Sequence, residues 1–429
     1  MRRSERLVLL CVFATAGLLA PLRLAAQERV PSPEAAQVSQ ELALLRQEFQ
    51  TLRETYEARF ADLESRLAAL ESSAAPATQQ PSATVPAGAA GAGGPSGALP
   101  VYGGASALSK VFNPDIAVIG DFLGAAGSNP VNPSPALEMH ESEASFQAIL
   151  DPYARADFFM AFGEEGVDLE EGYVTFPAIP GGLLLKAGKM RSAFGKVNPL
   201  HNHVLPWTDR PLVTENLVGG EEGISDAGFS VARLIPNPWV FLEAAGQVYR
   251  GDSPGVFQSY ERGDLSYVGH LRGYQDVTEA SNLDMGFSYA HGHNDAGPGF
   301  TTDLYGADFT FRYRPLRRAI YRSFIARSEL VWSRRDQIDG RQGAFGYFVS
   351  GDYQFARRWY SGVRYDDSER AYDRSLRDEG YSLVLTYWPS EFSQIRGQFR
   401  RTSYAEGEDA NEFLFQFQFS IGAHGAHPF

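Results

Sequence analysis

From about residue 113 to its end, the chain consists of segments in which apolar residues recur at every second position, separated by turn residues. In the last segment, EFLFQFQFSIG, Phe413, Phe415, Phe417 and Phe419 follow this period. A two-residue period is typical of a β-strand with one apolar face. We identify about sixteen such segments, each near or above the roughly 10 residues that cross a bilayer as a tilted strand. They are residues 115–127, 139–150, 153–164, 167–178, 183–195, 225–235, 239–250, 265–275, 281–292, 300–313, 320–334, 343–355, 359–368, 378–388, 391–404 and 411–422.

The connections between these segments fall into two alternating classes. Those in one phase are short and several contain proline, such as DP at 151 and WPSE at 388. Those in the opposite phase are longer, polar and mostly acidic, such as RRDQIDGRQG at 334 and DDSERAYDRSLRDEG at 366. Outer-membrane barrels alternate short periplasmic turns with long external loops in this way. A soluble β-sandwich has the same strand pattern, but its apolar face needs a second sheet. We therefore expect an all-β transmembrane barrel of about 16 antiparallel strands in residues 113–429, with its apolar face toward lipid.

The N-terminus has the pattern of a secretory signal peptide in residues 1–26. Three arginines precede an apolar run from Leu7 to Ala20, and Leu24-Ala25-Ala26 forms a plausible cleavage site. The run is short of the roughly 20 residues that a membrane-spanning helix needs, which disfavours the alternative of an uncleaved anchor. The single cysteine, Cys11, would be removed with the signal, so the exported chain is expected to have no disulfide.

Residues 27–72 are expected to form a periplasmic coiled-coil helix. Apolar residues there recur at steps of 3 and 4, from Val38 through Leu52 to Leu70, with one stutter at Tyr56. A single amphipathic helix that lies on the barrel or the membrane is the alternative. Residues 73–112 are rich in Ala, Pro, Gly and Ser and are expected to act as a flexible linker. The predicted fold is therefore a barrel preceded by an α-helical coiled coil.

The charge balance and the absence of motifs exclude several classes of function. The net charge is −14, which disfavours a nucleic-acid partner. The sequence contains no phosphate-binding loop, no HExxH and no GxSxG. We therefore expect neither an enzyme nor a cofactor. An outer-membrane enzyme or adhesin is a rival hypothesis, but we find no arrangement of Ser and His that would form its site.

An outward apolar face places the polar face of each strand in the lumen. A polar lumen of mixed charge is typical of a water-filled channel. Alternatively, each charge is simply a solvated or cross-strand paired wall residue. The wall residues that we select are Arg155, Arg272, Arg327, Arg364, Arg396, Arg400, Glu141, Glu143 and Asp157.

One connection, residues 196–224, is much longer than the others and contains many apolar residues. Long loops in compact proteins are usually functional, and the apolar residues indicate that this one folds against the inner wall. The expected pore constriction consists of His201, His203, Asp209, Arg210, Glu215, Glu221 and Glu222. His201 and His203 are also a candidate metal pair, with Glu221 or Glu222 as a third ligand. Because two histidines are an incomplete site, ordinary polar loop residues are the simpler interpretation.

The stretch GGLLLKAGKMRSAFGKVN, residues 181–198, resembles an element of the phosphate-selective porin O and P family. In that family, as in other trimeric porins of Gram-negative bacteria, a similar strand leads into the long constriction loop between strands five and six. The resemblance implies a sixteen-stranded trimeric porin with an N-terminal coiled coil. The sequence has no run of basic residues that would imply phosphate specificity.

These observations together predict a bacterial outer-membrane porin for passive diffusion of small hydrophilic solutes or ions. The expected partners are outer-membrane lipid, the transported solutes, the barrel-assembly machinery and two further copies of the chain, held through the coiled coil and the barrel. Phe417, Phe419 and the terminal Phe429 resemble the assembly signal of such barrels. The last strand either continues to Phe429 or ends near Gly422. The alternative function is a substrate-specific transporter or receptor, for example for a metal ion.

Overall fold

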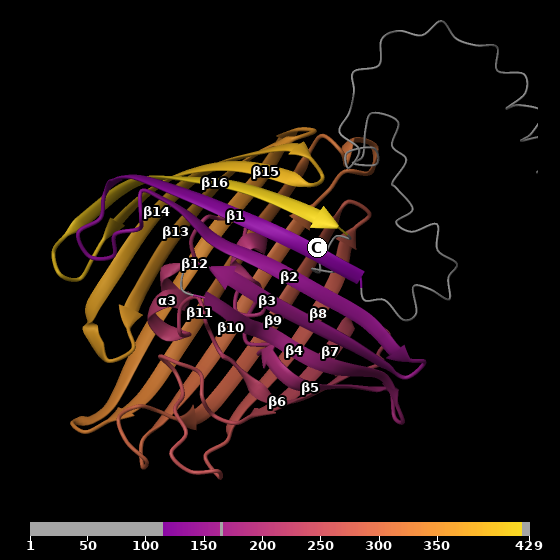
Figure 1. Cartoon of the computed structure of the whole chain (residues 1–429), viewed down its shortest axis with the longest axis vertical. Coiled ribbons are helices and arrows are strands. Elements are labelled where there is room, and N and C mark those ends of the chain that lie inside the picture. Colours follow the sequence, from indigo (N-terminus) through magenta and orange to yellow (C-terminus); the bar gives the residue numbers. More distant parts are fainter. Residues whose placement is uncertain (1–114, 164–165, 423–429) are drawn as a thin grey trace, which may run out of the picture. The chain divides into compact units, whose positions relative to one another are not determined.

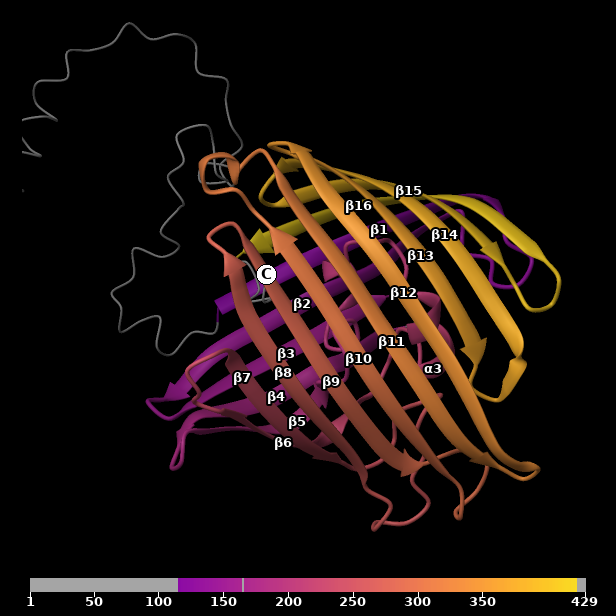
Figure 2. The same cartoon turned by 180° about the vertical axis from the view of Figure 1, so that it is seen from behind.

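Sixteen antiparallel strands form a closed barrel in the computed structural model, which describes residues 115–163 and 166–422 (Figures 1 and 2). Each strand pairs with its sequence neighbours, and β1 closes the ring against β16. The predicted barrel and all sixteen of its strands are therefore confirmed. The strands are β1 (Asp115–Ser128), β2 (Leu137–Asp151), β3 (Ala154–Gly163), β4 (Gly166–Ile179), β5 (Leu183–Arg191), β6 (Ser225–Leu234), β7 (Phe241–Tyr249), β8 (Ser266–Thr278), β9 (Ser281–His293), β10 (Thr301–Tyr313), β11 (Ser323–Gln337), β12 (Gly340–Ala356), β13 (Trp359–Arg370), β14 (Asp373–Ser390), β15 (Ser393–Ser403) and β16 (Asp409–Gly422).

Closure leaves no sheet edge among the described strands. In the closing pair, Phe122 of β1 lies opposite Phe417 of β16, and the pairing continues to Ala117 opposite Gly422. Each backbone amide within the ladder can therefore pair with a neighbouring strand, which a hydrocarbon environment requires. The strand β16 ends at Gly422. Phe429 lies outside the described residues.

The two faces of the sheet differ in polarity as the sequence predicts. On β16, Phe413 is 51% exposed on the outside of the barrel, whereas Gln416 is 1% exposed on the inside. The same division holds on β15, where Phe399 is outside and Arg396 and Gln398 are buried inside. The described part of the chain contains no helix that is long and apolar enough to cross a membrane. The exposed phenylalanines and the buried polar residues of β15 and β16 thus give the barrel an apolar outer belt and a polar interior.

Some of the predicted long loops are shorter than expected. The segment 366–380 is mostly strand, because β13 continues to Arg370 and β14 begins at Asp373. The segment 334–343 likewise forms the ends of β11 and β12. Opposite charges across the hairpin stabilise this extension. Arg377 lies 2.5 Å from Asp367, and Arg370 lies 3.0 Å from Asp378.

Three short helices complete the described structure: η1 (Asn202–Val204), α3 (Leu212–Leu217) and η2 (Leu316–Arg318). The first two belong to the long connection between β5 and β6. This connection begins at residue 192, because β5 ends at Arg191 and not at residue 195 as predicted. The predicted signal peptide, coiled coil and linker all lie outside the described residues.

Candidate functional site

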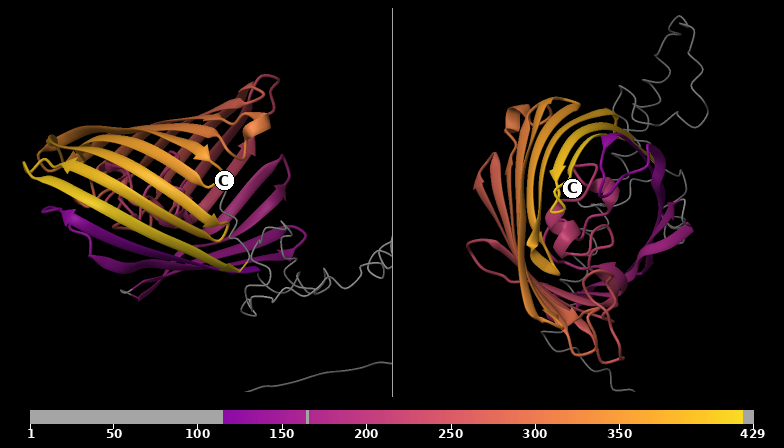
Figure 3. Two further views of the ribbon diagram at one scale, coloured as in Figure 1. Left: turned by 90° about the horizontal axis from the view of Figure 1, so that it is seen from above. Right: turned by 90° about the vertical axis from the view of Figure 1, so that its left-hand side faces the viewer.

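The connection between β5 and β6, residues 192–224 and here called the inner loop, lies inside the barrel. Figure 3 (right) shows it enclosed by the strands. Its buried apolar side chains include Leu205, Trp207 and Leu217, as the sequence predicts for a loop that packs on a wall. They join a hydrophobic cluster with inward-facing residues of β5, β7 to β12 and β14, and α3 contacts β11 to β14. In this cluster the ring of Trp207 meets that of Phe348 edge-on at 5.2 Å. The inner loop is therefore packed on one side of the lumen.

The two ends of the inner loop are joined by Asn198. Its amide nitrogen donates to the carbonyl oxygens of Ser192, at 3.0 Å, and Ile224, at 3.1 Å. Its amide oxygen accepts from the backbone nitrogen of Ile224 at 2.8 Å. A further bond joins the backbone nitrogen of Ser192 to the carbonyl oxygen of Ile224. One buried side chain thus closes a loop of 33 residues, from 192 to 224.

The first turn of the inner loop is fixed to β9 and β11. Glu329 of β11 accepts hydrogen bonds from the backbone nitrogens of Lys196 and Val197, at 2.9 and 3.2 Å. The ammonium group of Lys196 lies 2.7 Å from Asp284 of β9. Gly195 has a φ of 62°, and a Cβ there would collide with the Glu329 carboxylate. The FG of the porin-like stretch is therefore a requirement of backbone conformation and close approach.

The tip of the inner loop, at Trp207 and Asp209, is held by a basic patch on the wall. The patch consists of Arg364 of β13 and Arg396 and Arg400 of β15. The carboxylate of Asp209 lies 2.8 Å from Arg364 and 3.0 Å from Arg400, and it accepts from Gln398 at 2.5 Å. Burial alone would raise the pKa of Asp209, but the two guanidinium groups and the hydrogen bonds outweigh it and lower the pKa to about 2. The guanidinium of Arg364 also lies over the Trp207 ring, 4.8 Å from its centroid.

We expected Arg210 to line the pore constriction, but the structure places it away from the lumen. It is 3% exposed and lies inside the inner loop, where it donates to the carbonyl oxygen of Leu200 at 2.6 Å and to Asn202 Oδ1 at 2.8 Å. Burial, with the repulsion of Arg191, lowers the pKa of Arg210 to about 10. An arginine whose donors can bond to backbone carbonyls is stabilised inside the loop and is withdrawn from the lumen.

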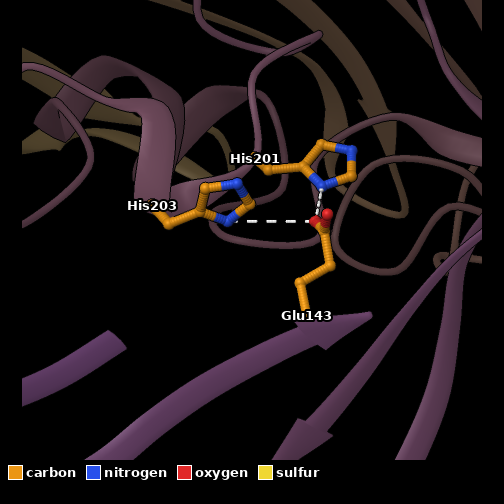
Figure 4. Close-up of side chains that lie close together, drawn as sticks. All are labelled: Glu143, His201 and His203. Atoms are coloured by element: carbon orange, nitrogen blue, oxygen red, sulfur yellow. Dashed lines mark hydrogen bonds and ion pairs between the residues drawn. The ribbon is translucent and has the colours of Figure 1, made fainter. Parts of the chain in front are cut away.

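The opposite side of the inner loop meets an acidic part of the wall on β2 and β4. His201 and His203 are 3% and 2% exposed and lie beside Glu143 of β2, so they are not at the pore axis (Figure 4). His201 also faces Glu170 at 3.0 Å and Glu171 at 3.3 Å. Burial disfavours the charged imidazole, but the bonds to these three carboxylates raise the pKa of His201 well above its ordinary value.

The third ligand that we expected for the histidine pair is replaced by another carboxylate. Glu221 lies 3.6 Å from His140 of β2, and Glu222 is exposed beside a cavity of about 870 Å³. Glu143 comes from β2, 58 positions before His201. The carboxylate was missed because only the closed barrel brings β2 next to the inner loop. Glu215, Glu221 and Glu222 are the expected constriction residues that remain exposed.

The selected wall residues all project from the inner face, and most are paired with an opposite charge. Asp157 accepts from Arg155 at 2.6 Å. Arg396 donates to the carbonyl oxygen of Trp207 and to Gln416. Other pairs are Arg272 with Asp284, Arg327 with Asp352, Arg364 with Asp366 and Arg400 with Glu412. Glu141 is buried, and its Oε1 has no hydrogen-bond partner among the described residues.

Sequence reasoning missed four residues that hold the inner loop: Asn198, Gln398, Glu170 and Glu171. The adjacent pair Glu170 and Glu171 was a detectable signal of an irregular strand. Neighbours in a regular strand face opposite sides, so one of the two glutamates would have faced lipid. Both face the histidines here, since the pairing of β3 with β4 shifts between Phe159 and Met160. Such a bulge turns an extra side chain inward.

This fold, with a long loop packed inside a ring of sixteen strands, defines the class of porin-type barrels. The anion-selective porin from Comamonas acidovorans is similar to the chain with a TM-score of 0.52 and 11% identity, over 72% of this chain and 99% of that one. Pseudomonas putida OprB is also similar, with a TM-score of 0.52 and 10% identity over 73% of this chain and 95% of that one.

A relative in sequence is described as an uncharacterized protein of Aquifex aeolicus (strain VF5). It is 31% identical over 346 residues, which are 70% of this chain and 71% of that protein. The chain therefore belongs to the same family as the Aquifex protein. No family model matches the sequence.

Proposed function

We propose that the chain forms a water-filled channel in the bacterial outer membrane, through which small hydrophilic solutes or ions diffuse passively. The observation that carries this proposal is the division of the barrel into an apolar outer belt and a charged inner wall, with the inner loop folded inside. Such an interior is solvated in known outer-membrane barrels. The similarity of the fold to solved porins supports the proposal.

The inner loop contacts a basic part of the wall on one side and an acidic part on the other. Its tip meets the basic patch of Arg364, Arg396 and Arg400, and its first half meets the acidic wall of Glu141 and Glu143. The exposed carboxylates Glu215, Glu221 and Glu222 are the loop charges that solutes would encounter. Rings and rows of charge at a narrow point set the ion preference of a channel. We therefore propose that these three exposed carboxylates determine which ions pass, whereas the mostly buried basic patch holds the loop tip in place.

Single-channel recording in planar bilayers tests the proposed channel. The full-length chain is expected to insert with stepwise increases in conductance, and the reversal potential in a salt gradient reports the ion preference. A variant without the inner loop is unsuitable, because the loop carries much of the buried apolar surface. Glu222→Gln, which removes one exposed charge, is expected to shift the reversal potential toward anions. The absence of conductance steps from correctly folded protein would exclude the channel.

We also propose that three copies assemble, through the barrel and the periplasmic coiled coil of residues 27–72. A barrel of this class exposes an apolar belt on which another barrel can pack. The apolar positions of a heptad-like repeat are buried when helices of several copies form a coiled coil. Chemical crosslinking of the protein in native outer membranes is expected to give trimers. A chain without residues 27–72 is the matched comparison, and it separates the contribution of the helix from that of the barrel. Monomers alone from the intact chain would contradict the proposal.

A further inference from the structure

Two histidines of the inner loop and four carboxylates of the wall form a buried cluster. His201 immediately precedes the 3-10 turn η1 and His203 lies within it, and their rings lie edge-to-face with centroids 5.7 Å apart. The carboxylates are Glu141 and Glu143 of β2 and Glu170 and Glu171 of β4. The porin function proposed above has no use for these groups, because they are withdrawn from the lumen and packed between the loop and the wall.

Three donor atoms converge in this cluster. Nδ1 of His201 and Nδ1 of His203 both face the same oxygen of Glu143, Oε2, as the dashed lines in Figure 4 show. The ligand atoms of the three residues all lie within 4.8 Å of one another, and His203 Nδ1 is 3.8 Å from the Glu143 oxygen. Zinc binds such donors at about 2.0–2.1 Å, and tetrahedral donors at that radius are about 3.3 Å apart. Small side-chain movements therefore bring this set to coordination distance.

The other ring nitrogen of His201 has the partner that a metal ligand requires. Its Nε2 lies 3.3 Å from Glu171 Oε2, so Nε2–H can donate to that carboxylate. This bond leaves the lone pair of Nδ1 directed at Glu143 and Glu170. Metal-binding histidines usually donate their second nitrogen to a carboxylate in this way, which fixes the tautomer and the orientation of the ring.

The charge balance of the cluster also calls for a cation. Arg191 supplies one guanidinium, 3.2 Å from Glu170, and its backbone nitrogen donates to Glu171. Four carboxylates, three of them buried and Glu170 nearly so, surround one guanidinium and carry an excess of negative charge, which is costly away from water. Glu141 is 7% exposed, and its Oε1 is without a hydrogen-bond partner among the described residues. Its carboxylate approaches those of Glu143 and Glu170 within 4.8 Å.

We propose that Glu143, His201 and His203 bind one divalent zinc ion, with Glu170 as the fourth ligand. The ion joins the inner loop to β2 and β4. Glu171 positions His201, and Glu141 lies beside the ion and is neutralised by it. Two imidazoles and carboxylate oxygens suit zinc, whereas calcium and magnesium prefer sites made of oxygen alone. The site is structural, so it stands independently of the proposed transport.

The test measures bound metal directly on the full-length protein in detergent. The protein is stripped with a chelator, incubated with zinc chloride, desalted and assayed for zinc by mass spectrometry. One zinc per chain is expected for the unmodified protein, and an excess of magnesium chloride is not expected to displace it. His203→Asn is expected to lose the bound zinc. Glu171→Gln is expected to retain one zinc with an affinity about 10- to 100-fold weaker, because Glu171 only orients a ligand.

A matched control is His291→Asn, which removes a histidine that pairs with Asp303 of β10 instead of the cluster. This variant is expected to bind zinc as the unmodified protein does. Folding of each variant is checked by the heat-dependent change in its electrophoretic migration. An unmodified chain that retains no zinc after desalting would overturn the proposal. A folded His203→Asn variant that still binds one zinc would overturn it too. Neither result would affect the channel proposal, which is tested by conductance.

Discussion

The carboxylate of Asp209 lies 2.8 Å from Nη2 of Arg364, although 155 positions separate the two residues in the sequence. Arg364 belongs to β13 and is 3% exposed, and its Nε also bonds to Asp366 at 2.6 Å. The tip of the inner loop is thereby held to the far side of the ring from β5, where the loop begins. The position of the tip in the lumen depends on this contact and on the packing of Trp207.

Replacement of Asp209 by Asn is expected to release the tip of the inner loop. Removing one partner of a buried ion pair costs about 3–5 kcal/mol, and the lower end is expected because Arg364 and Arg400 keep Asp366 and Glu412. A released tip moves in the lumen, so single-channel recordings should show more current fluctuation than the unmodified chain. Asp303→Asn, on the outer face, is the control. Recordings of equal noise would contradict the proposed anchoring.

The same carboxylate predicts an effect of acid. The pKa of Asp209 is lowered to about 2, so its contribution to stability is complete above the ordinary aspartate value near 4. The contribution is lost as the pH falls from about 4 toward 2, where Asp209 becomes protonated. The difference in thermal midpoint between the unmodified protein and Asp209→Asn should therefore be constant from pH 7 to pH 5 and shrink in stronger acid. A difference that grows below pH 4 would be inconsistent with this.

The ion preference of the channel is expected to change near neutral pH through Glu215. Partial desolvation of the carboxylate among the surrounding protein atoms and the repulsion of Glu221 raise the pKa of Glu215 to about 7, although Arg210 partly opposes this. Glu215 is therefore mostly neutral at pH 6 and mostly charged at pH 8. Cation preference, measured from reversal potentials, should increase over this interval. Glu215→Gln should remove most of that increase, and an unchanged pH profile in this variant would count against the assignment.

Gly195→Ala is expected to destabilise the inner loop at its first turn. A residue other than glycine at a φ of 62° costs about 1–2 kcal/mol, and the new Cβ would also displace the Glu329 carboxylate from the backbone of Lys196 and Val197. The thermal midpoint of the barrel, followed by electrophoretic migration after heating, should fall. The control is Gly246→Ala, because nothing lies within 4 Å of its added Cβ. Equal midpoints for the two variants would show that the turn tolerates a side chain.

Trp207→Ala is expected to have a larger effect than the glycine substitution. Trp207 is 1% exposed, packs on Phe348 and lies under the Arg364 guanidinium, so its loss leaves a cavity and removes a cation–π contact. Truncation of a buried Trp costs about 3–5 kcal/mol. Unfolding in denaturant would measure this. Trp239→Ala should have little effect, because Trp239 is 80% exposed. A similar stability for both variants would argue against the buried position of Trp207.

Strand number and the orientation of each face could be predicted because both depend on neighbouring residues. The alternation of Phe413, Phe415 and Phe417 with inward residues can be recognised in the sequence alone, without knowing which strand lies next to β16. The inward position of the loop was likewise predictable from its apolar composition. Loop lengths were predicted less well at 366–380, because acidic and basic residues there pair across a hairpin instead of remaining solvated.

The sequence by itself thus determined that this chain forms a sixteen-stranded barrel with apolar residues outside, charges inside and one long loop directed inward. Only the tertiary structure decided which groups the loop meets: Asp209 with Arg364, and His201 with Glu143. The physical reason is that periodicity is a local property, whereas these contacts depend on the closure of β1 against β16 and on the path of the loop across the lumen. A bulge in the pairing of β3 with β4 then sufficed to bring Glu170 and Glu171 to the same histidine.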